Sequence, residues 1–302
     1  MANPLLRLPE ALGSSRLDQM GPQVPHFPFW LAGRFSIDLR SPKIMGIVNL
    51  TPDSFSDGGS YLEPSKALAH AEQLLKEGAD ILDIGAESSR PGAIPISDQE
   101  EWARLETVLK ELVKWNCPIS IDTYRPETMR RALEVGADII NDIWALRQDG
   151  AIEAVAQSDC GLCLMHMQGD PQTMQVTPIE KGVVPMVKLF FQNVSQRLQE
   201  FEIDSKRWLI DPGIGFGKSV SQNLVLLAQQ KELMALGQAM LVGWSRKSTL
   251  GHVTGLEPKR RLIPSVTAAL MAVDRGASVV RVHDVQETRQ ALQIWAAVNN
   301  EK

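Results

Sequence analysis

Short apolar runs alternate along the chain with longer segments that have the periodicity of amphipathic helices. Eight of these runs are apolar over most of their length, as expected of parallel strands that are covered on both faces. Eight strand-and-helix units predict a TIM (β/α)8 barrel. The alternative is a doubly wound open sheet, but no glycine-rich dinucleotide fingerprint follows the first run. The runs span residues 43–49, 81–85, 119–122, 139–142, 162–166, 208–211, 240–243 and 279–282.

Three of the predicted helices end with the same pattern. A glycine closes each helix, and an apolar pair begins three residues later, as at Gly78, Gly136 and Gly276. Glycine at this position suits a left-handed helix cap. A polar side chain follows five residues after each glycine and falls toward the C-terminal end of the next strand. Because the active sites of TIM barrels lie at that end, we expect these side chains to meet there. They are Asp83, Asn141 and Arg281.

The first predicted strand ends at Asn49 and enters a polar loop rich in Gly, Pro and Ser. Segment 50–62 is longer than an ordinary strand-to-helix link, which predicts a functional loop. We assign residues 1–42 to an N-terminal extension and residues 43–302 to the barrel. Within the extension, residues 34–39 are expected to form a short strand or hairpin that closes the bottom of the barrel, without a chemical role.

Composition narrows the class of protein. The chain has 302 residues, of which 44% are hydrophobic and 22% are charged, which is enough for one large α/β barrel or two smaller domains. No apolar run approaches a membrane span, and the N-terminus lacks the layout of a secretory signal, so we expect a cytoplasmic protein. The net charge of −5 argues against nucleic acid as the main partner, and any anionic ligand needs a local basic cluster.

Three cysteines fit a reducing compartment. Cys160 and Cys163 have the spacing of a redox motif, yet they lie where a buried strand is predicted. We therefore favour packing over a thiol role, which stays open as the alternative. No spacing of His, Cys and carboxylates suggests a zinc site.

The strand ends collect side chains of both charge signs. Asp122, Asn141 and Asp211 form an acceptor-rich wall that suits a ring with several N–H donors. A phosphate or carboxylate could be held by basic residues nearby. The expected ligand has one anionic end and one donor-rich heterocycle. The basic candidates are Arg90, Lys247, Arg281 and His283.

Each candidate also has a structural interpretation. Asp83 and Asp142 could cap helices, since a lone carboxylate after a strand is often an N-cap. His166 is more easily explained as a packed histidine than as a base. Lys218 and Arg246 could be solvated surface residues.

Seven ordered segments resemble the motifs of bacterial dihydropteroate synthases, a pterin-binding TIM-barrel family. The resemblance extends from about residue 43 to the C-terminus. It implies a transferase of folate biosynthesis that condenses (7,8-dihydropterin-6-yl)methyl diphosphate with 4-aminobenzoate, uses Mg²⁺, forms a homodimer and is a target of sulfonamides. The segments are 45–59, 83–92, 121–123, 140–142, 211–218, 245–248 and 281–285.

The same resemblance implies a role for individual residues. Asn49 would contact Mg²⁺ and the diphosphate, and Arg281 and His283 would hold the diphosphate. Catalysis is expected to be electrostatic and to involve Asp122, Asp211, Lys247 and Arg281, with loops 50–62 and 86–98 closing over the substrates. The implied contacts to the pterin diphosphate are Ser89, Asp122, Asn141, Asp211, Lys247, Arg281 and His283. The implied contacts to aminobenzoate are Arg90, Pro91, Phe216 and Ser248.

Two rival functions remain open. A methyltetrahydrofolate-dependent corrinoid methyltransferase would share a pterin-binding barrel, but it would not need the anion site at Arg281 and His283. A catalytically inert pterin-binding homologue would show decayed motifs, and none of the seven segments is decayed.

Overall fold

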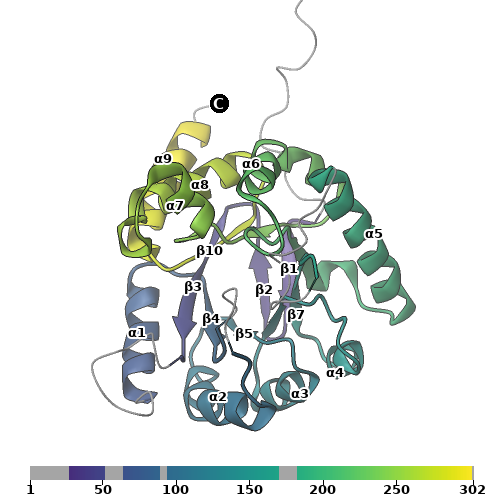
Figure 1. The fold of residues 1–302 in the computed structure, drawn as a ribbon. Coiled ribbons are helices and arrows are strands. Elements are labelled where there is room, and N and C mark those ends of the chain that lie inside the picture. Colours follow the sequence, from purple (N-terminus) through teal and green to yellow (C-terminus); the bar gives the residue numbers. More distant parts are fainter. Residues whose placement is uncertain (1–26, 52–63, 89–93, 170–181, 301–302) are drawn as a thin grey trace, which may run out of the picture.

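The computed structural model describes residues 27–51, 64–88, 94–169 and 182–300, which form a parallel eight-stranded barrel surrounded by helices (Figure 1). The predicted TIM barrel is therefore confirmed. Six predicted strands have the observed bounds, whereas β7 begins one residue earlier than predicted and β9 is shorter. In chain order the strands are β3 (Lys43–Asn49), β4 (Ile81–Gly85), β5 (Ile119–Asp122), β6 (Ile139–Asp142), β7 (Gly161–Met165), β8 (Trp208–Asp211), β9 (Leu241–Val242) and β10 (Val279–Val282).

The strands follow the order β8-β7-β6-β5-β4-β3-β10-β9, and the register between neighbours is parallel throughout. The two ends of this order also meet. Ile210 of β8 donates its backbone N–H to the carbonyl of Ala239 at 3.0 Å and forms a bridge with Met240. This contact joins β8 to the start of β9 and completes the ring.

Helices cover the outside of the ring, because the outward residues of the strands are apolar and fully buried, as at Ile44 and Leu82. The predicted helix caps are confirmed, since Gly78, Gly136 and Gly276 have φ values of 101°, 112° and 94°. In the described part of the chain, no helix combines the length and apolar character needed to cross a membrane. The helices are α1 (Pro64–Lys76), α2 (Asp98–Leu112), α3 (Pro126–Val135), α4 (Ala151–Ala156), α5 (Val183–Glu200), α6 (Val220–Ala228), α7 (Ser248–Thr254), α8 (Leu262–Asp274) and α9 (Val285–Asn300).

The inside of the barrel has two layers of opposite character. Side chains two residues apart on a strand share a face, so each inward residue is followed by another one layer higher. The lower layer is apolar and consists of Met45, Ile81, Ile139, Cys163, Leu209, Leu241 and Val279. Two positions further along, the strands bring Asp83, Asn141, Asp211 and Arg281 to the level above, which we call the polar layer. Asp122, at the end of β5, faces the same level.

The cysteines contribute to packing. Cys117, Cys160 and Cys163 are free and buried. Burial raises the pKa of the Cys160 thiol, and it raises that of Cys163 well above its usual value. Both thiols are therefore protonated at neutral pH, which supports the packing interpretation over a redox role.

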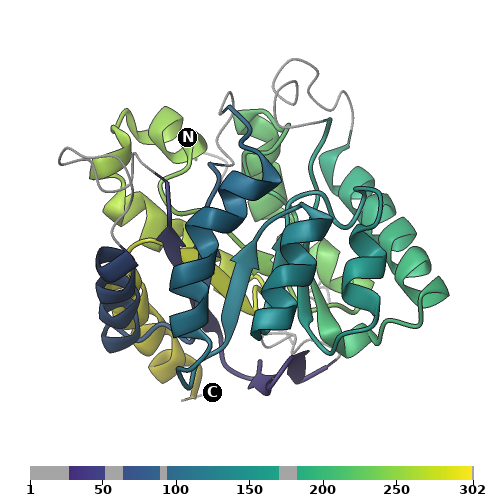
Figure 2. The same cartoon turned by 90° about the horizontal axis from the view of Figure 1, so that it is seen from below.

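A two-stranded antiparallel hairpin precedes the barrel and lies across its lower end (Figure 2). It consists of β1 (Phe29–Ala32) and β2 (Phe35–Asp38), so it starts before the segment 34–39 in which a strand was expected. Trp30 and Ile37 pack against the lower layer of the barrel. A Cβ atom at Gly161 would lie 2.8 Å from the Cβ of Ala32, so the hairpin approaches β7 this closely only because residue 161 is glycine.

Candidate active site

Several of the expected site residues lie at the C-terminal ends of the strands. The strand register places Asn49 beside Gly85, Gly85 beside Asp122, and Asp122 beside Asn141, across four neighbouring strands. Asp211 ends β8, and Arg281 lies in β10. The ends of β3 to β6 thus lie side by side at the mouth of the barrel, and β7 lies between Asn141 and Asp211.

Arg281 lies against the predicted acceptor wall and makes two charged contacts. Its Nε is 2.6 Å from Oδ2 of Asp83, and its Nη2 is 2.7 Å from Oδ2 of Asp122. Burial alone would lower the pKa of Arg281, but the neighbouring carboxylates Asp83 and Asp122 outweigh it and raise the pKa. The acceptor wall and the expected diphosphate contact are therefore joined by direct ion pairs.

Burial also shifts the other charged groups of the site. It raises the pKa of Asp122 to about 7, against the opposing effect of Arg281, and it raises the pKa of Asp211. The pKa of Lys247 is lowered to about 8, mainly by burial and despite the attraction of Asp211. Asp122 and Lys247 therefore change charge near neutral pH, as is common in active sites.

The loop that follows β8 holds Asp211 and Phe216 in place. The N–H of Gly213 donates to Oδ1 of Asp211 at 2.7 Å. A Cβ atom at Gly213 would lie 2.0 Å from the carbonyl oxygen of His166, and φ is 68°, so only glycine fits there. Phe216 is buried, and the Nζ of Lys247 lies 4.2 Å from the centre of its ring.

Lys218 is buried below the same loop, so the expectation of a solvated lysine is wrong. Its Nζ donates to the backbone carbonyls of His166, Gly213 and Phe216 at 3.1, 2.9 and 3.0 Å. Burial lowers its pKa to about 7. The ammonium group therefore fixes the shape of the loop through three carbonyl groups.

The remaining described candidates surround this centre. His283 shares a hydrogen bond of 2.9 Å between its Nδ1 and Oγ of Ser245. Ser248 is exposed at the first position of α7, directly after Lys247. Asn49 is partly buried at the end of β3. Ser89, Arg90 and Pro91 lie outside the described residues, as do residues 52–62 of the predicted loop.

Three residues have structural explanations, although Asp142 lies in a turn and not at the start of a helix as expected. Asp142 accepts hydrogen bonds from the N–H groups of Trp144 and Leu146 at 2.7 and 2.6 Å and therefore caps a turn. His166 packs edge-on against Phe190 at 4.9 Å, and burial lowers its pKa to about 2, so it is neutral. Arg246 is exposed, but it pairs with Asp284 at 2.5 Å.

Comparison with known proteins agrees with this geometry. The profile of a family described as pterin binding enzyme matches residues 45–283. The chain belongs to this family. A dihydropteroate synthase of Neisseria meningitidis serogroup B is 54% identical over 276 residues, which cover 89% of this chain and 97% of the relative.

Solved structures of pterin-binding enzymes share the fold. A dihydropteroate synthase of Burkholderia cenocepacia complexed with 7,8-dihydropteroate has a TM-score of 0.83 and 45% identity, covering 90% of this chain and 97% of the other. A dihydropteroate synthase of Xanthomonas albilineans with 4-aminobenzoic acid has a TM-score of 0.85 and 46% identity, covering 90% and 98%.

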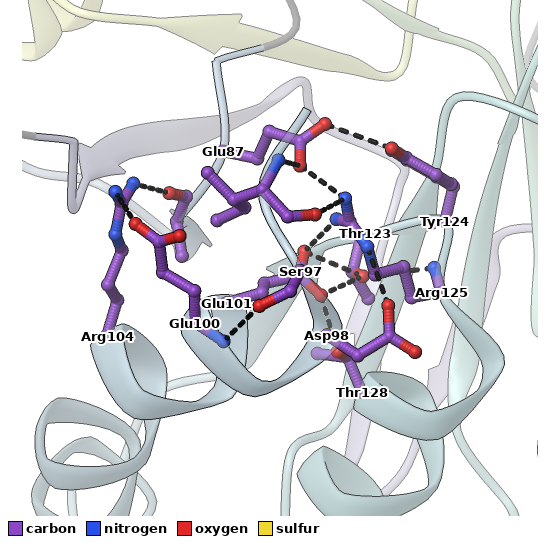
Figure 3. A network of polar contacts seen from close by, with 12 residues as sticks. Glu87, Ser97, Asp98, Glu100, Glu101, Arg104, Thr123, Tyr124, Arg125 and Thr128 are labelled. Carbon is purple, nitrogen blue, oxygen red and sulfur yellow. Dashed lines mark hydrogen bonds and ion pairs between the residues drawn. The ribbon is translucent and has the colours of Figure 1, made fainter. Parts of the chain in front are cut away.

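One polar network of this pterin-binding enzyme was not predicted from the sequence (Figure 3). Arg125, with only 8% of its side chain exposed, lies among three carboxylates: Glu87 at 2.5 Å, Asp98 at 3.0 Å and Glu101 at 3.3 Å. Its Nη2 also donates to the carbonyl of Ile96, whose N–H donates to Glu87. The network therefore fixes both ends of the chain between β4 and α2.

Asp83 was expected at this end of the barrel but was assigned no ligand contact, and its interpretation as a helix cap is wrong, because its carboxylate accepts from the side chains of Ser120, Asn141 and Arg281. The sequence contained a signal for it, because Asp83 lies two positions after the inward-facing Ile81 and so faces the interior of the barrel. Lys218 and Arg125 had no such signal. Their burial depends on how distant loops fold over them, which the local pattern does not contain.

The residues present fit Mg²⁺ only if a substrate supplies most of the ligands. Among the described residues there is no group of three or more His, Cys, Asp or Glu side chains that could bind a metal together. Asn49 offers an amide oxygen at the mouth of the barrel. Mg²⁺ commonly takes one or two protein oxygens together with phosphate oxygens and water, so this donor set suits a metal that arrives with a diphosphate.

Proposed function

We propose that this pterin-binding enzyme is a dihydropteroate synthase, which joins (7,8-dihydropterin-6-yl)methyl diphosphate to 4-aminobenzoate in folate biosynthesis. The observation that best supports this function is the direct contact between the acceptor wall and a cation, through Asp122 and Arg281. The substrate has the matching pair of features, a ring rich in N–H donors and a diphosphate next to it. The relatives named dihydropteroate synthase support the same conclusion.

The reaction breaks one bond and forms one bond at the CH₂ group of the pterin. The C–O bond to the diphosphate breaks, the amine of aminobenzoate forms a C–N bond, and the amine loses one proton. Because the ring is electron-rich, C–O cleavage can run ahead of attack, which leaves positive charge in the pterin. Asp122 and Asp211 would stabilise this charge, since preorganised charges stabilise transition states without reorganisation.

The site residues divide between the two ends of the substrates. We assign Asp122, Asn141, Asp211 and Lys247 to the pterin ring, and Arg281, His283 and Asn49 to the diphosphate. Ser89 is assigned to the pterin diphosphate as well. Phe216 and Ser248 would lie on the aminobenzoate side, together with Arg90 and Pro91. Phe216 is suited to this role because Lys247 lies against its ring and orders it at the mouth.

Mg²⁺ would be held by Asn49 and by the diphosphate oxygens of the substrate. When bound, it would neutralise charge on the leaving diphosphate. The protein groups act in the same direction, because Arg281 is cationic at all accessible pH values and His283 is held by Ser245 beside it.

The decisive experiment is a product assay. Purified protein is incubated with the pterin diphosphate, 4-aminobenzoate and Mg²⁺, and we expect equal amounts of 7,8-dihydropteroate and diphosphate. Asp211→Asn serves as the control for a contaminating activity, because it removes a charge from the site. Absence of product from the parental protein, with binding of the pterin retained, would instead identify an inert pterin-binding homologue.

We also propose that the enzyme is a homodimer in the cytoplasm and that residues 1–42 are an extension of the barrel. A dimer is supported by exposed apolar side chains on α8 and α9, namely Ile263, Met271, Ile294 and Val298. A reducing compartment is supported by three free cysteines. Light scattering of the purified protein measures the oligomeric state.

A further inference from the structure

Asp83 in β4 connects four strands below the ligand site. Its side chain is fully buried, and its two oxygens receive hydrogen bonds from side chains of three other strands. Oγ of Ser120 in β5 is 2.6 Å away, Nδ2 of Asn141 in β6 is 3.2 Å away, and Nε of Arg281 in β10 is 2.6 Å away. Every partner is a donor, as an ionised carboxylate requires, because it can only accept.

The carboxylate of Asp83 sets the orientation of the side-chain amide of Asn141. The Nδ2 group of Asn141 points to Asp83, at 3.2 Å from Oδ2 and 3.4 Å from Oδ1. A planar amide has its oxygen on the other side of its terminal carbon, so Oδ1 is directed away from Asp83 and toward the site. The wall therefore presents an acceptor at this position, which suits a ring with N–H donors.

The same carboxylate fixes one edge of Arg281. Nε is held by Asp83, whereas Nη2 contacts Asp122 at the ligand site. A ligand that offers its own donors to Asp122 competes with Nη2 for that carboxylate. Nη2 is then available to an anion next to the ring, while Nε stays bound to Asp83 and keeps the guanidinium in position.

We propose that Asp83 is a positioning residue that fixes the hydrogen-bond polarity of the site, with the acceptor of Asn141 toward the pterin ring and the donors of Arg281 toward the diphosphate. This inference rests on the proposed function. It predicts that one buried charge, which touches neither substrate, controls the binding of both ends of the pterin diphosphate.

The test compares Asp83→Asn with Ser120→Ala in the full chain. Asparagine offers both a donor and an acceptor, so the amide of Asn141 can turn over and Arg281 loses a charged partner. We expect calorimetry to show affinities for 6-hydroxymethyl-7,8-dihydropterin and for Mg-diphosphate reduced about tenfold or more, as for loss of a charge-assisted hydrogen bond. Ser120→Ala removes a different bond to Asp83 without altering a group that faces the ligand, and it should change both affinities less than roughly threefold.

Two further measurements separate positioning from general stability. In a double-mutant cycle for diphosphate binding, Asp83→Asn should add little to Arg281→Gln, because both remove the same interaction. The KM for aminobenzoate should stay within roughly threefold of the parental value, whereas a loosened fold would affect all ligands. Equal losses for all three ligands, or additive losses in the cycle, would overturn the proposal.

The parental protein offers a test that does not depend on the folding of a variant. In an NMR spectrum of protein with isotope-labelled arginine, the Nε–H signal of Arg281 can be assigned by its loss in Arg281→Gln. This proton should be protected from exchange with solvent both before and after pterin binding. Rapid exchange in either state would contradict a permanent bond to Asp83. If the product assay fails while these results hold, the proposed reaction is wrong but the positioning role stands.

Discussion

At the scale of single residues, Asp122 and Asp211 should each contribute to both binding and catalysis. Asp122→Asn and Asp211→Asn keep the shape of the side chain but remove the charge that would face the pterin. We expect each variant to lower kcat/KM about a hundredfold or more, because loss of one preorganised electrostatic contact has an effect of this size. Steady-state kinetics measure the change, and circular dichroism checks the fold. Near-parental activity in a folded variant would mean that the residue is only structural.

The pH dependence of pterin binding follows from two of the shifted groups. Asp122, with a pKa of about 7, is protonated at lower pH and then loses its capacity as a charged acceptor. Lys247, with a pKa of about 8, loses its charge at higher pH. Affinity should therefore rise with pH through the first value and fall through the second, which gives a bell-shaped profile with its maximum between them.

Calorimetry with 6-hydroxymethyl-7,8-dihydropterin measures this profile without interference from the titration of a diphosphate. Asp122→Asn is the matched variant, and it should lack the acidic limb while keeping the alkaline limb. A flat profile for the parental protein would show that neither group changes charge in the free site.

At the scale of elements, the network around Arg125 should stabilise the connection between β4 and α2. Arg125→Met leaves Glu87 and the fully buried Glu101 without their cation. Burial already raises the pKa of Glu101, so the loss of a positive neighbour makes its ionised form still less favourable. Removing one partner of a buried ion pair typically costs about 3–5 kcal/mol, and we expect a decrease of that order in the free energy of unfolding.

Arg131→Met is the matched control for this variant. Arg131 also pairs with a glutamate, Glu127 at 2.9 Å, but both side chains are more than two-fifths exposed. Exposed pairs contribute little to stability. Denaturant unfolding should therefore show a much smaller change for the control, and equal changes in the two variants would contradict the role of the network.

The same contrast explains what the sequence could predict about elements. Strands such as β4 and β6 were predicted to the residue, because an apolar run and a preceding glycine are local signals. Asp122, Asn141 and Arg281 could be placed at one end of the barrel for the same reason. The burial of Lys218 and the ion pairs of Arg125 and Arg281 could not, since each joins segments far apart in the sequence.

At the scale of the whole molecule, the hairpin closes the lower end of the barrel, opposite the ligand site. Trp30 donates its Nε1–H to the carbonyl of Arg207 at 2.9 Å, and Arg34 pairs with Asp138 at 2.9 Å, so the hairpin is attached next to the first residues of β8 and β6. Below the polar layer, the apolar side chains of barrel and hairpin fill the interior. Substrates and products must therefore share one entrance.

A shared entrance has a kinetic consequence. In the proposed arrangement, with its pterin end against the polar layer and its aminobenzoyl end toward the mouth, dihydropteroate would occupy the whole path that the next pterin diphosphate must take. The product must leave by the path along which the substrate enters, so dihydropteroate and the pterin diphosphate cannot occupy the barrel at the same time. Product-inhibition kinetics should show dihydropteroate competing with the pterin diphosphate. A purely noncompetitive pattern would reveal a second exit at the lower end of the barrel, beside the hairpin.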